Sequence, residues 1–139
     1  MPIDRVDPKN QGQVRGFVPA IRTENIVYIS GQVGKDSTGS VVGEDISSQT
    51  RQTFNNIKGL LELCEAGLEN IVKLTVFLTH VQDMDNFRKI RAEYFNAPTL
   101  PTSTLVVVSA LAQPDLRVEV EAIAHLGNLP SIASGSYTY

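Results

Sequence analysis

The sequence has few of the residues that build metal sites, disulfides or membrane spans. Its 139 residues include one cysteine, two histidines and no tryptophan. Cys64 alone cannot form an intrachain disulfide, and with the separated His80 and His125 it has no zinc-ligand spacing. No stretch approaches the roughly 18 apolar residues that span a bilayer, and the first residues are too charged for a secretion signal. We therefore expect a cytosolic protein without a metal site and without membrane contact.

Positive charge is also in short supply. Twelve Lys and Arg stand against 15 Asp and Glu, which gives a net charge of -3 and a pI of about 5.3. Neither the whole chain nor a local basic patch would attract phosphates, so nucleic acid is disfavoured as a partner. The chain does have 42% apolar residues, enough for one core. We expect a single domain over residues 1–126 and a tail, 127–139, that is mobile or packs on a neighbour.

Apolar periodicity predicts two helices among five or six strands. Apolar residues at steps of three and four predict a helix over 46–66, with Asp45 as N-terminal cap and Gly67 as C-terminal cap. A second helix is expected over 86–95. Strands are expected at 18–22, 26–30, 70–79, 103–109 and 117–125, and the first two form a hairpin. This order favours an α+β architecture with both helices on one face of a mixed sheet.

The strand expected over 70–79 alternates as a half-buried strand does. Its buried face is expected to carry Val72, Leu74, Val76 and Leu78. Cys64 lies on the apolar stripe of the first helix, which predicts a core position rather than a reactive thiol.

Three stretches carry a resemblance to a known family: "YISGQVG", "DMDNFRKIRAEYF" and "LRVEVEAIA". In this order and spacing they resemble the RidA/YjgF family of reactive-imine deaminases over roughly residues 14–126. The resemblance implies a chorismate-mutase-like fold, a barrel-like homotrimer with three ligand clefts between subunits, and no cofactor or metal. In deaminases of this family an arginine in a "PARS"-like motif binds the substrate carboxylate, and a glutamate in an "EIE"-like strand positions water.

Three residues match the family's site. Ser30 and Gly31 match its "SG" pair, which implies a ligand-binding role and a backbone N–H donor. Glu119 matches the water-positioning glutamate and is the candidate catalytic residue. From the residues alone, glycine in a strand is also typical of a bulge, and Glu119 alternating with Glu121 is also typical of a solvated strand face.

Four other candidate ligand-binding positions depart from the family. Ser103 stands where the arginine is expected, because the chain has "PTST" in place of "PARS". Phe17 replaces a usual tyrosine, Arg91 a usual asparagine, and Leu105 a frequent cysteine. A guanidinium binds a carboxylate bidentately, so its loss at Ser103 removes the strongest anchor for a 2-imino acid. Either the anchor is vacated or Arg91 replaces it; a long side chain on a helix can extend to water, which favours the vacated anchor.

Two classes of function stay open. One is a small-metabolite hydrolase of the RidA/YjgF type, an imine or enamine deaminase whose usual 2-imino acid activity is weak or absent. The other is a non-catalytic protein that binds a small metabolite or a partner in the same cleft. The ribonuclease role of some relatives fits poorly with the acidic composition. A cation facing Glu119 and Gly31 across the cleft would favour the first class.

Overall fold

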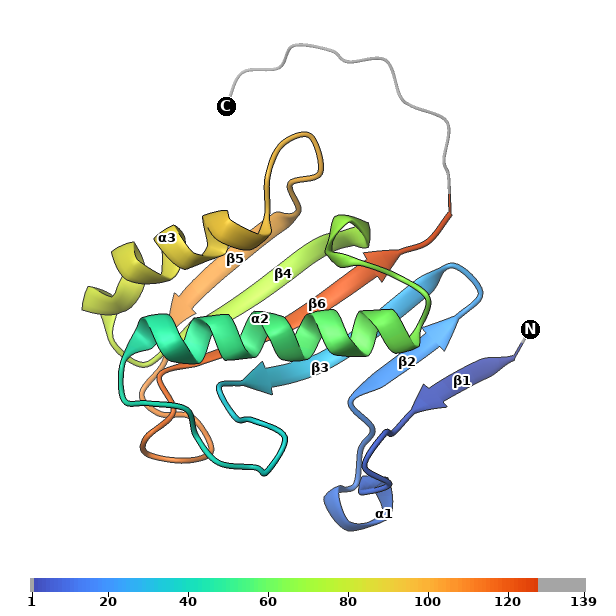
Figure 1. Cartoon of the computed structure of the whole chain (residues 1–139), viewed down its shortest axis with the longest axis horizontal. Helices are drawn as coiled ribbons and strands as arrows, with labels where there is room; N and C mark the ends of the chain where they lie inside the picture. The colour runs from blue at the N-terminus through green and yellow to red at the C-terminus, as the bar shows by residue number, and fades with distance from the viewer. Residues whose placement is uncertain (1, 128–139) are drawn as a thin grey trace.

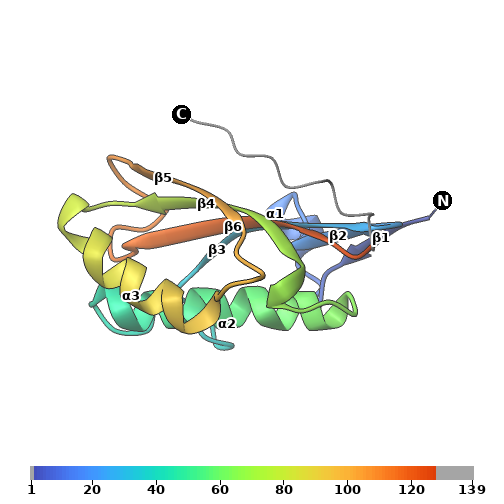
Figure 2. The ribbon, with the colours of Figure 1, turned by 90° about the horizontal axis from the view of Figure 1, so that it is seen from above.

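A computed structural model describes residues 2–127 as a six-stranded mixed sheet with two long helices on one face (Figures 1 and 2). The strand order is β1-β2-β3-β6-β4-β5, in which only β4 and β5 are parallel neighbours. The strands are β1 (Ile3–Val6), β2 (Ala20–Thr23), β3 (Ile26–Val33), β4 (Ile71–Leu78), β5 (Thr102–Val107) and β6 (Val118–His125). The helices are α1 (Gly12–Arg15), α2 (Ile46–Leu63) and α3 (Met84–Tyr94), with 3-10 turns η1 (Leu68–Asn70) and η2 (Val81–Asp83). The predicted α+β architecture is confirmed.

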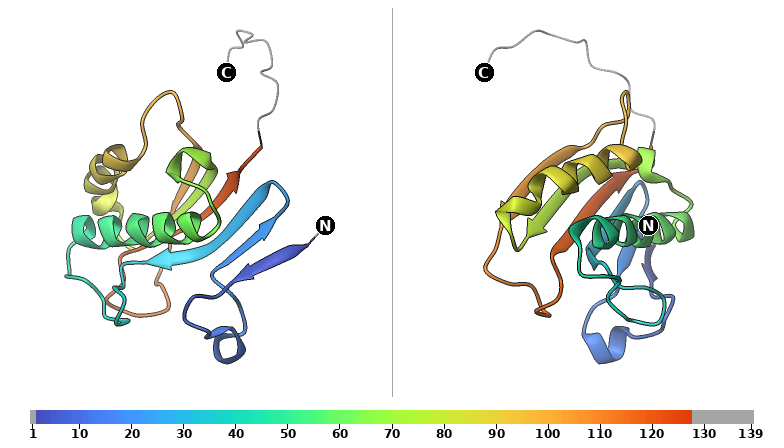
Figure 3. Two further views of the ribbon diagram at one scale, coloured as in Figure 1. Left: turned by 45° about the vertical axis from the view of Figure 1, so that its right-hand side comes forward. Right: turned by 60° about the vertical axis from the view of Figure 1, so that its left-hand side comes forward.

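The first 17 residues contain two elements that the sequence did not predict, α1 and β1. Strand β1 pairs antiparallel with β2 at the edge of the sheet (Figure 3). Its residues are exposed except for the half-buried Val6, so it shows no apolar alternation for sequence reasoning to detect.

Helix α2 begins as predicted and ends earlier than predicted. The Asp45 carboxylate accepts a hydrogen bond from the Ser48 N–H at 2.9 Å and caps the first turn. The expected C-terminal cap at Gly67 is wrong, because the helix ends at Leu63 and Glu65 takes the left-handed conformation with φ of 61°. Gly67 is instead the N-cap residue that precedes η1, and its N–H donates to Asn70 Oδ1.

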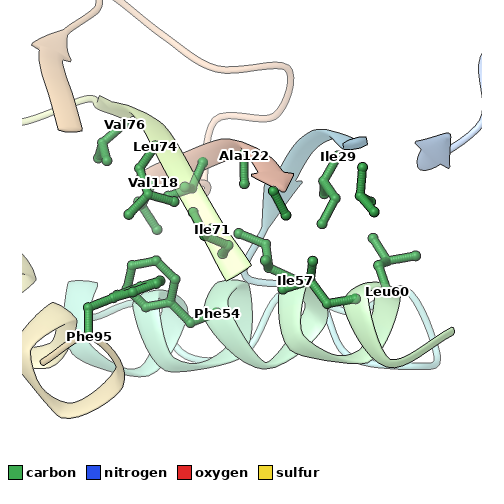
Figure 4. Packing of buried hydrophobic residues seen from close by; sticks show 14 of the residues in the cluster. Ile29, Phe54, Ile57, Leu60, Ile71, Leu74, Val76, Phe95, Val118 and Ala122 are labelled. Carbon is green, nitrogen blue, oxygen red and sulfur yellow. The ribbon is translucent and has the colours of Figure 1, made fainter. Parts of the chain in front are cut away.

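The core lies between the sheet and helices α2 and α3 (Figure 4). Phe54 of α2 is fully buried and packs its ring 6.0 Å from that of Phe87 and 5.3 Å from that of Phe95. Cys64 is buried in the same cluster, as predicted. The strands contribute alternate residues, with Leu74, Val76, Leu78, Val118 and Val120 fully buried.

The prediction for the buried face of β4 is wrong at one residue. Val72 is 48% exposed, whereas Ile71 beside it is buried. The β4–β6 register shifts between Ile71 and Lys73, and this irregularity places Ile71 in the core instead of Val72. The alternation resumes from Leu74 as predicted.

We call the face of the sheet opposite α2 and α3 the open face. Along β6 the residues between the buried ones, among them Glu119 and Glu121, lie on this face. No helix in residues 2–127 is long and apolar enough to cross a bilayer. Apart from Gly127, the predicted tail lies outside the described residues, and the single domain over 1–126 and the homotrimer stay predictions.

Candidate functional site

The first part of the candidate site is a close contact between β3 and β6. The β3–β6 register shifts between Ile29 and Gln32, which leaves Ser30 and Gly31 in an irregular stretch beside Glu119. A Cβ atom on Gly31 would overlap the Glu119 carboxylate and would lie 2.8 Å from its Cδ. Only glycine therefore allows this carboxylate to lie against the β3 backbone.

The environment of Glu119 favours its protonated form. Burial, and secondly the negative charge of Glu121, raise the pKa of Glu119. Within residues 2–127, no lysine or arginine nitrogen lies within 4.0 Å of its carboxylate oxygens. A carboxylate with a raised pKa is a stronger base than an ordinary one, so it suits accepting a proton from water. The Ser30 hydroxyl beside it donates to the Pro19 carbonyl at 3.2 Å.

A cavity of about 330 Å³ is lined by the sequence neighbours of this contact, Ser30 on β3 and Glu121 on β6. Gly31 and Glu119 themselves are not in its lining. Its walls also include Tyr28, Thr75 and Lys73. Lys73 and Thr75 alternate with the residues that were predicted for the buried face of β4, but sequence reasoning did not connect them with a cavity. The pairing of β4 with β6 makes this connection, because it places Thr75 opposite Glu121.

The second part of the candidate site lies between α3 and β5. The half-buried Arg91 side chain turns toward β5. Its Nη1 donates to Ser103 Oγ at 3.3 Å, and its guanidinium carbon lies 5.5 Å from the centre of the Phe87 ring. Burial, and secondly the charge of Arg88, lower the pKa of Arg91. A cavity of about 300 Å³ is lined by Arg88, Arg91, Ala92, Phe95, Leu100, Pro101 and Ser103. Sequence reasoning missed Arg88, although its spacing of three residues from Arg91 places both on one helix face.

Two predicted site residues lie apart from both clusters. Leu105 is half-buried, pairs with Val76 and packs against the core. Phe17 is 52% exposed, and although its neighbour Val18 lines the cavity near Ser30, Phe17 itself is not in that lining. Their proposed ligand-binding roles stay predictions.

The two clusters lie on opposite faces of the sheet. Ser103 pairs with the buried Leu74 of β4 and so faces the helices, where Arg91 reaches it. Glu119 lies between the buried Val118 and Val120 and so faces the open side. A single chain therefore brings together Ser30, Gly31 and Glu119, and separately Arg91 and Ser103, but not the two groups.

The family model described as Endoribonuclease L-PSP matches residues 9–126. The chain belongs to this family, also called YjgF/RidA. It is 39% identical over 110 residues to a RutC family protein of Pyrococcus horikoshii, covering 78% of this chain and 86% of that protein. It is 35% identical over 114 residues to the 2-iminobutanoate/2-iminopropanoate deaminase of Salmonella typhimurium, covering 78% and 85%.

A solved YjgF/RidA structure confirms the fold. The Rid family protein YyfA of Yersinia pestis, whose function is unknown, is similar with a TM-score of 0.82 at 33% identity. The likeness covers 89% of this chain and 99% of that one. The predicted family and fold class are therefore confirmed.

Proposed function

We propose that this YjgF/RidA protein is a hydrolase that acts on the C=N bond of a small imine, or on an enamine after its conversion to the imine. One observation carries the proposal: the half-buried Glu119 carboxylate lies against Gly31 with a raised pKa. The similarity to a protein named as a 2-iminobutanoate/2-iminopropanoate deaminase supports it.

The proposed reaction needs one base and one hydrogen-bond donor. Glu119 orients a water molecule and accepts its proton while the water oxygen bonds to the imine carbon. The same carboxyl then returns the proton to nitrogen, which gives a carbinolamine. The carboxylate next takes the hydroxyl proton of the carbinolamine and passes it to the amino group, and the C–N bond breaks to release ammonia and a carbonyl product. The Gly31 N–H donates to an oxygen of the substrate. Water is the only co-reactant.

We also propose that the complete site forms between copies of the chain, in a homotrimer. The separation of Ser103 and Glu119 on opposite faces supports this, because a neighbouring copy can present its α3–β5 surface to the open face of the first. The edge strand β5 also exposes Val106 and Val107 at 42% and 45%, and apolar edge strands are usually covered. Sedimentation should give about three times the 15.2 kDa chain mass. A monomer at micromolar concentration would contradict this arrangement.

Simple 2-imino acids should be poor substrates. Ser103 carries no charge, and Arg91 reaches this position from another element with one hydrogen bond of 3.3 Å. A charged hydrogen bond contributes about 1.5–3 kcal/mol, so a weakened anchor would cost about 10- to 100-fold. We expect hydrolysis of 2-iminobutanoate that is measurable but slow, or absent.

The proposal is tested with imines that an amino-acid oxidase produces in the assay, by measuring ammonia release with and without the protein. The wild type should accelerate release from at least one imine, and Glu119→Gln should remove about 100-fold or more of that acceleration. Glu62→Gln, an equal change on the exposed side of α2, is the control. Equal rates in the wild type and Glu119→Gln would contradict the proposed base.

The weakened anchor at Ser103 also supports a second candidate, a non-catalytic protein that binds a small metabolite or a partner in the same cleft. A wild type that binds the stable analogue 2-oxobutanoate but accelerates no imine hydrolysis would favour this candidate over the hydrolase.

A further inference from the structure

The α3–β5 cavity contains two arginines and no acidic residue in its lining. Arg88 and Arg91 are three residues apart on α3, so they are neighbours on one face of the helix. In the part of the chain that the structure describes, neither guanidinium lies within 4.0 Å of a carboxylate. Glu93, two residues after Arg91, pairs instead with Arg51 of α2.

The structure holds the Arg91 guanidinium in place for a ligand. The ring of Phe87 lies beneath it, and Ser103 Oγ accepts one of its N–H groups. Within residues 2–127 this is the one hydrogen bond that the Arg91 guanidinium makes, so its other N–H groups are available to a ligand. Arg88 lines the same cavity, so a second cation lies close to Arg91. Burial, and secondly the charge of Arg88, lower the pKa of Arg91.

We propose that this cavity binds a substrate with two separate carboxylates, a 2-imino dicarboxylate, through Arg91 and Arg88. The inference rests on the proposed hydrolase and names its substrate class. One carboxylate neutralises one guanidinium and leaves the other unpaired, whereas a dicarboxylate neutralises both. Two arginines on adjacent positions of a helix face, with Cβ atoms about 5–6 Å apart, suit two spaced carboxylates better than one compact phosphate. The apolar walls, Phe95, Leu100 and Pro101, suit the carbon chain between them.

Binding of stable oxo analogues tests the inference without requiring catalysis. Calorimetry at low salt compares 2-oxoglutarate with 2-oxopentanoate, which has the same chain length and one carboxylate fewer. We expect 2-oxoglutarate to bind about tenfold or more tightly in the wild type. Inorganic phosphate should compete weakly. Equal affinities for the two oxo acids, or phosphate binding as tight as that of 2-oxoglutarate, would overturn the inference.

Variants of α3 separate a specific site from general charge attraction. Arg88→Gln should reduce the preference for 2-oxoglutarate over 2-oxopentanoate below about threefold. Its affinity for 2-oxopentanoate should stay within about twofold of that of the wild type. Arg88→Lys should keep most of the preference. Arg91→Gln should weaken both ligands by about tenfold. Lys89→Gln removes the same charge from the same helix outside the cavity lining and should keep the preference. If Lys89→Gln lost as much of the preference for 2-oxoglutarate as Arg88→Gln, the result would contradict a specific site.

The result is distinguishable from a failure of the proposed hydrolase. A clear preference for 2-oxoglutarate without hydrolysis of any imine, including the imine of glutamate, supports the dicarboxylate site and contradicts the hydrolase. Hydrolysis of imines with equal affinity for both oxo acids supports the hydrolase and contradicts the dicarboxylate site.

Discussion

The two parts of the candidate site are built in different ways. Backbone geometry sets the first, because the Glu119 carboxylate lies where a Cβ atom on Gly31 would be. Long side chains set the second, where the guanidinium of Arg91 reaches Ser103 Oγ with a bond of 3.3 Å. The Gly31–Glu119 contact leaves no space for an added atom. The α3–β5 cavity, in contrast, can receive a guanidinium from a residue on the helix or from one on the strand. The proposed chemistry is therefore fixed by the sheet, and ligand selection can vary through α3 and β5.

The largest expected effect on the rate of hydrolysis comes from adding one methyl group at Gly31, in the contact of β3 with Glu119. Gly31→Ala should reduce hydrolysis about 100-fold or more, because the new Cβ displaces the Glu119 carboxylate from the water it orients. The free energy of unfolding should change by less than about 1 kcal/mol, since only the end of a flexible side chain has to move. Initial rates and chemical denaturation measure the two quantities.

Gly34→Ala is the matched control for that variant. Its Cβ would lie 2.7 Å from Gln49 Cβ and 2.8 Å from Gln49 Cα, inside the packed contact of β3 with α2. We expect a loss of about 1–3 kcal/mol in the free energy of unfolding, with activity per folded molecule retained. Full activity in Gly31→Ala would show that the close contact does not position the base.

A smaller effect is expected from placing at Ser103, in the α3–β5 part, the arginine that the family resemblance implies there. Ser103→Arg places a third guanidinium beside Arg91 and Arg88, so it should lower the free energy of unfolding by about 0.5–1 kcal/mol. It should gain little hydrolysis of 2-iminobutanoate. Thermal unfolding and initial rates measure these effects. A large gain of activity in this single variant would instead indicate a vacated anchor at Ser103.

The double variant Ser103→Arg with Arg91→Asn sharpens this test, since it introduces the arginine and asparagine that the family resemblance implies at these positions. Removal of the neighbouring cation should recover the lost stability and allow faster 2-iminobutanoate hydrolysis than in the wild type. If neither variant changes activity or stability, Ser103 does not face the ligand.

The smallest expected effect is a shift along the pH axis. Burial and the charge of Glu121 raise the pKa of Glu119 above its ordinary value of 4.5. If hydrolysis needs the ionised carboxylate, its rate is therefore at its maximum above the raised pKa and decreases as the pH falls through that pKa. Glu121→Gln removes the like charge, so the acid limb of the rate profile should move to lower pH. A limb that stays in place would indicate that Glu119 does not control the rate.

The sequence predicted the elements that carry regular patterns. The cap at Asp45, the alternation from Leu74 to Leu78 and the helix stripe through Cys64 follow from periodicity, and the structure confirms them. The contact of Gly31 with Glu119 was indicated only by family resemblance, because residues 88 positions apart in sequence meet through the pairing of β3 with β6.

Irregular features were beyond the sequence. Val72 and Ile71 are equally apolar, so only the register shift in β4 determines which one is buried. Gly67 was a reasonable helix end, but Glu65 takes the left-handed conformation two residues earlier. The direction of Arg91 could not be predicted either, because a long side chain on a helix can extend to water or turn back to a neighbouring strand.

The parallel pairing of β4 with β5 has a consequence for how this family can diverge. Parallel neighbours need a crossover, and here η2 and α3 provide it, so Arg88, Arg91 and Ser103 all lie within one continuous stretch from Ile71 to Val107. Glu119 and Gly31 lie outside that stretch, on β6 and β3. A single exchanged gene segment could therefore transplant the whole α3–β5 cavity from one relative to another, while the recipient keeps its own β3 and β6.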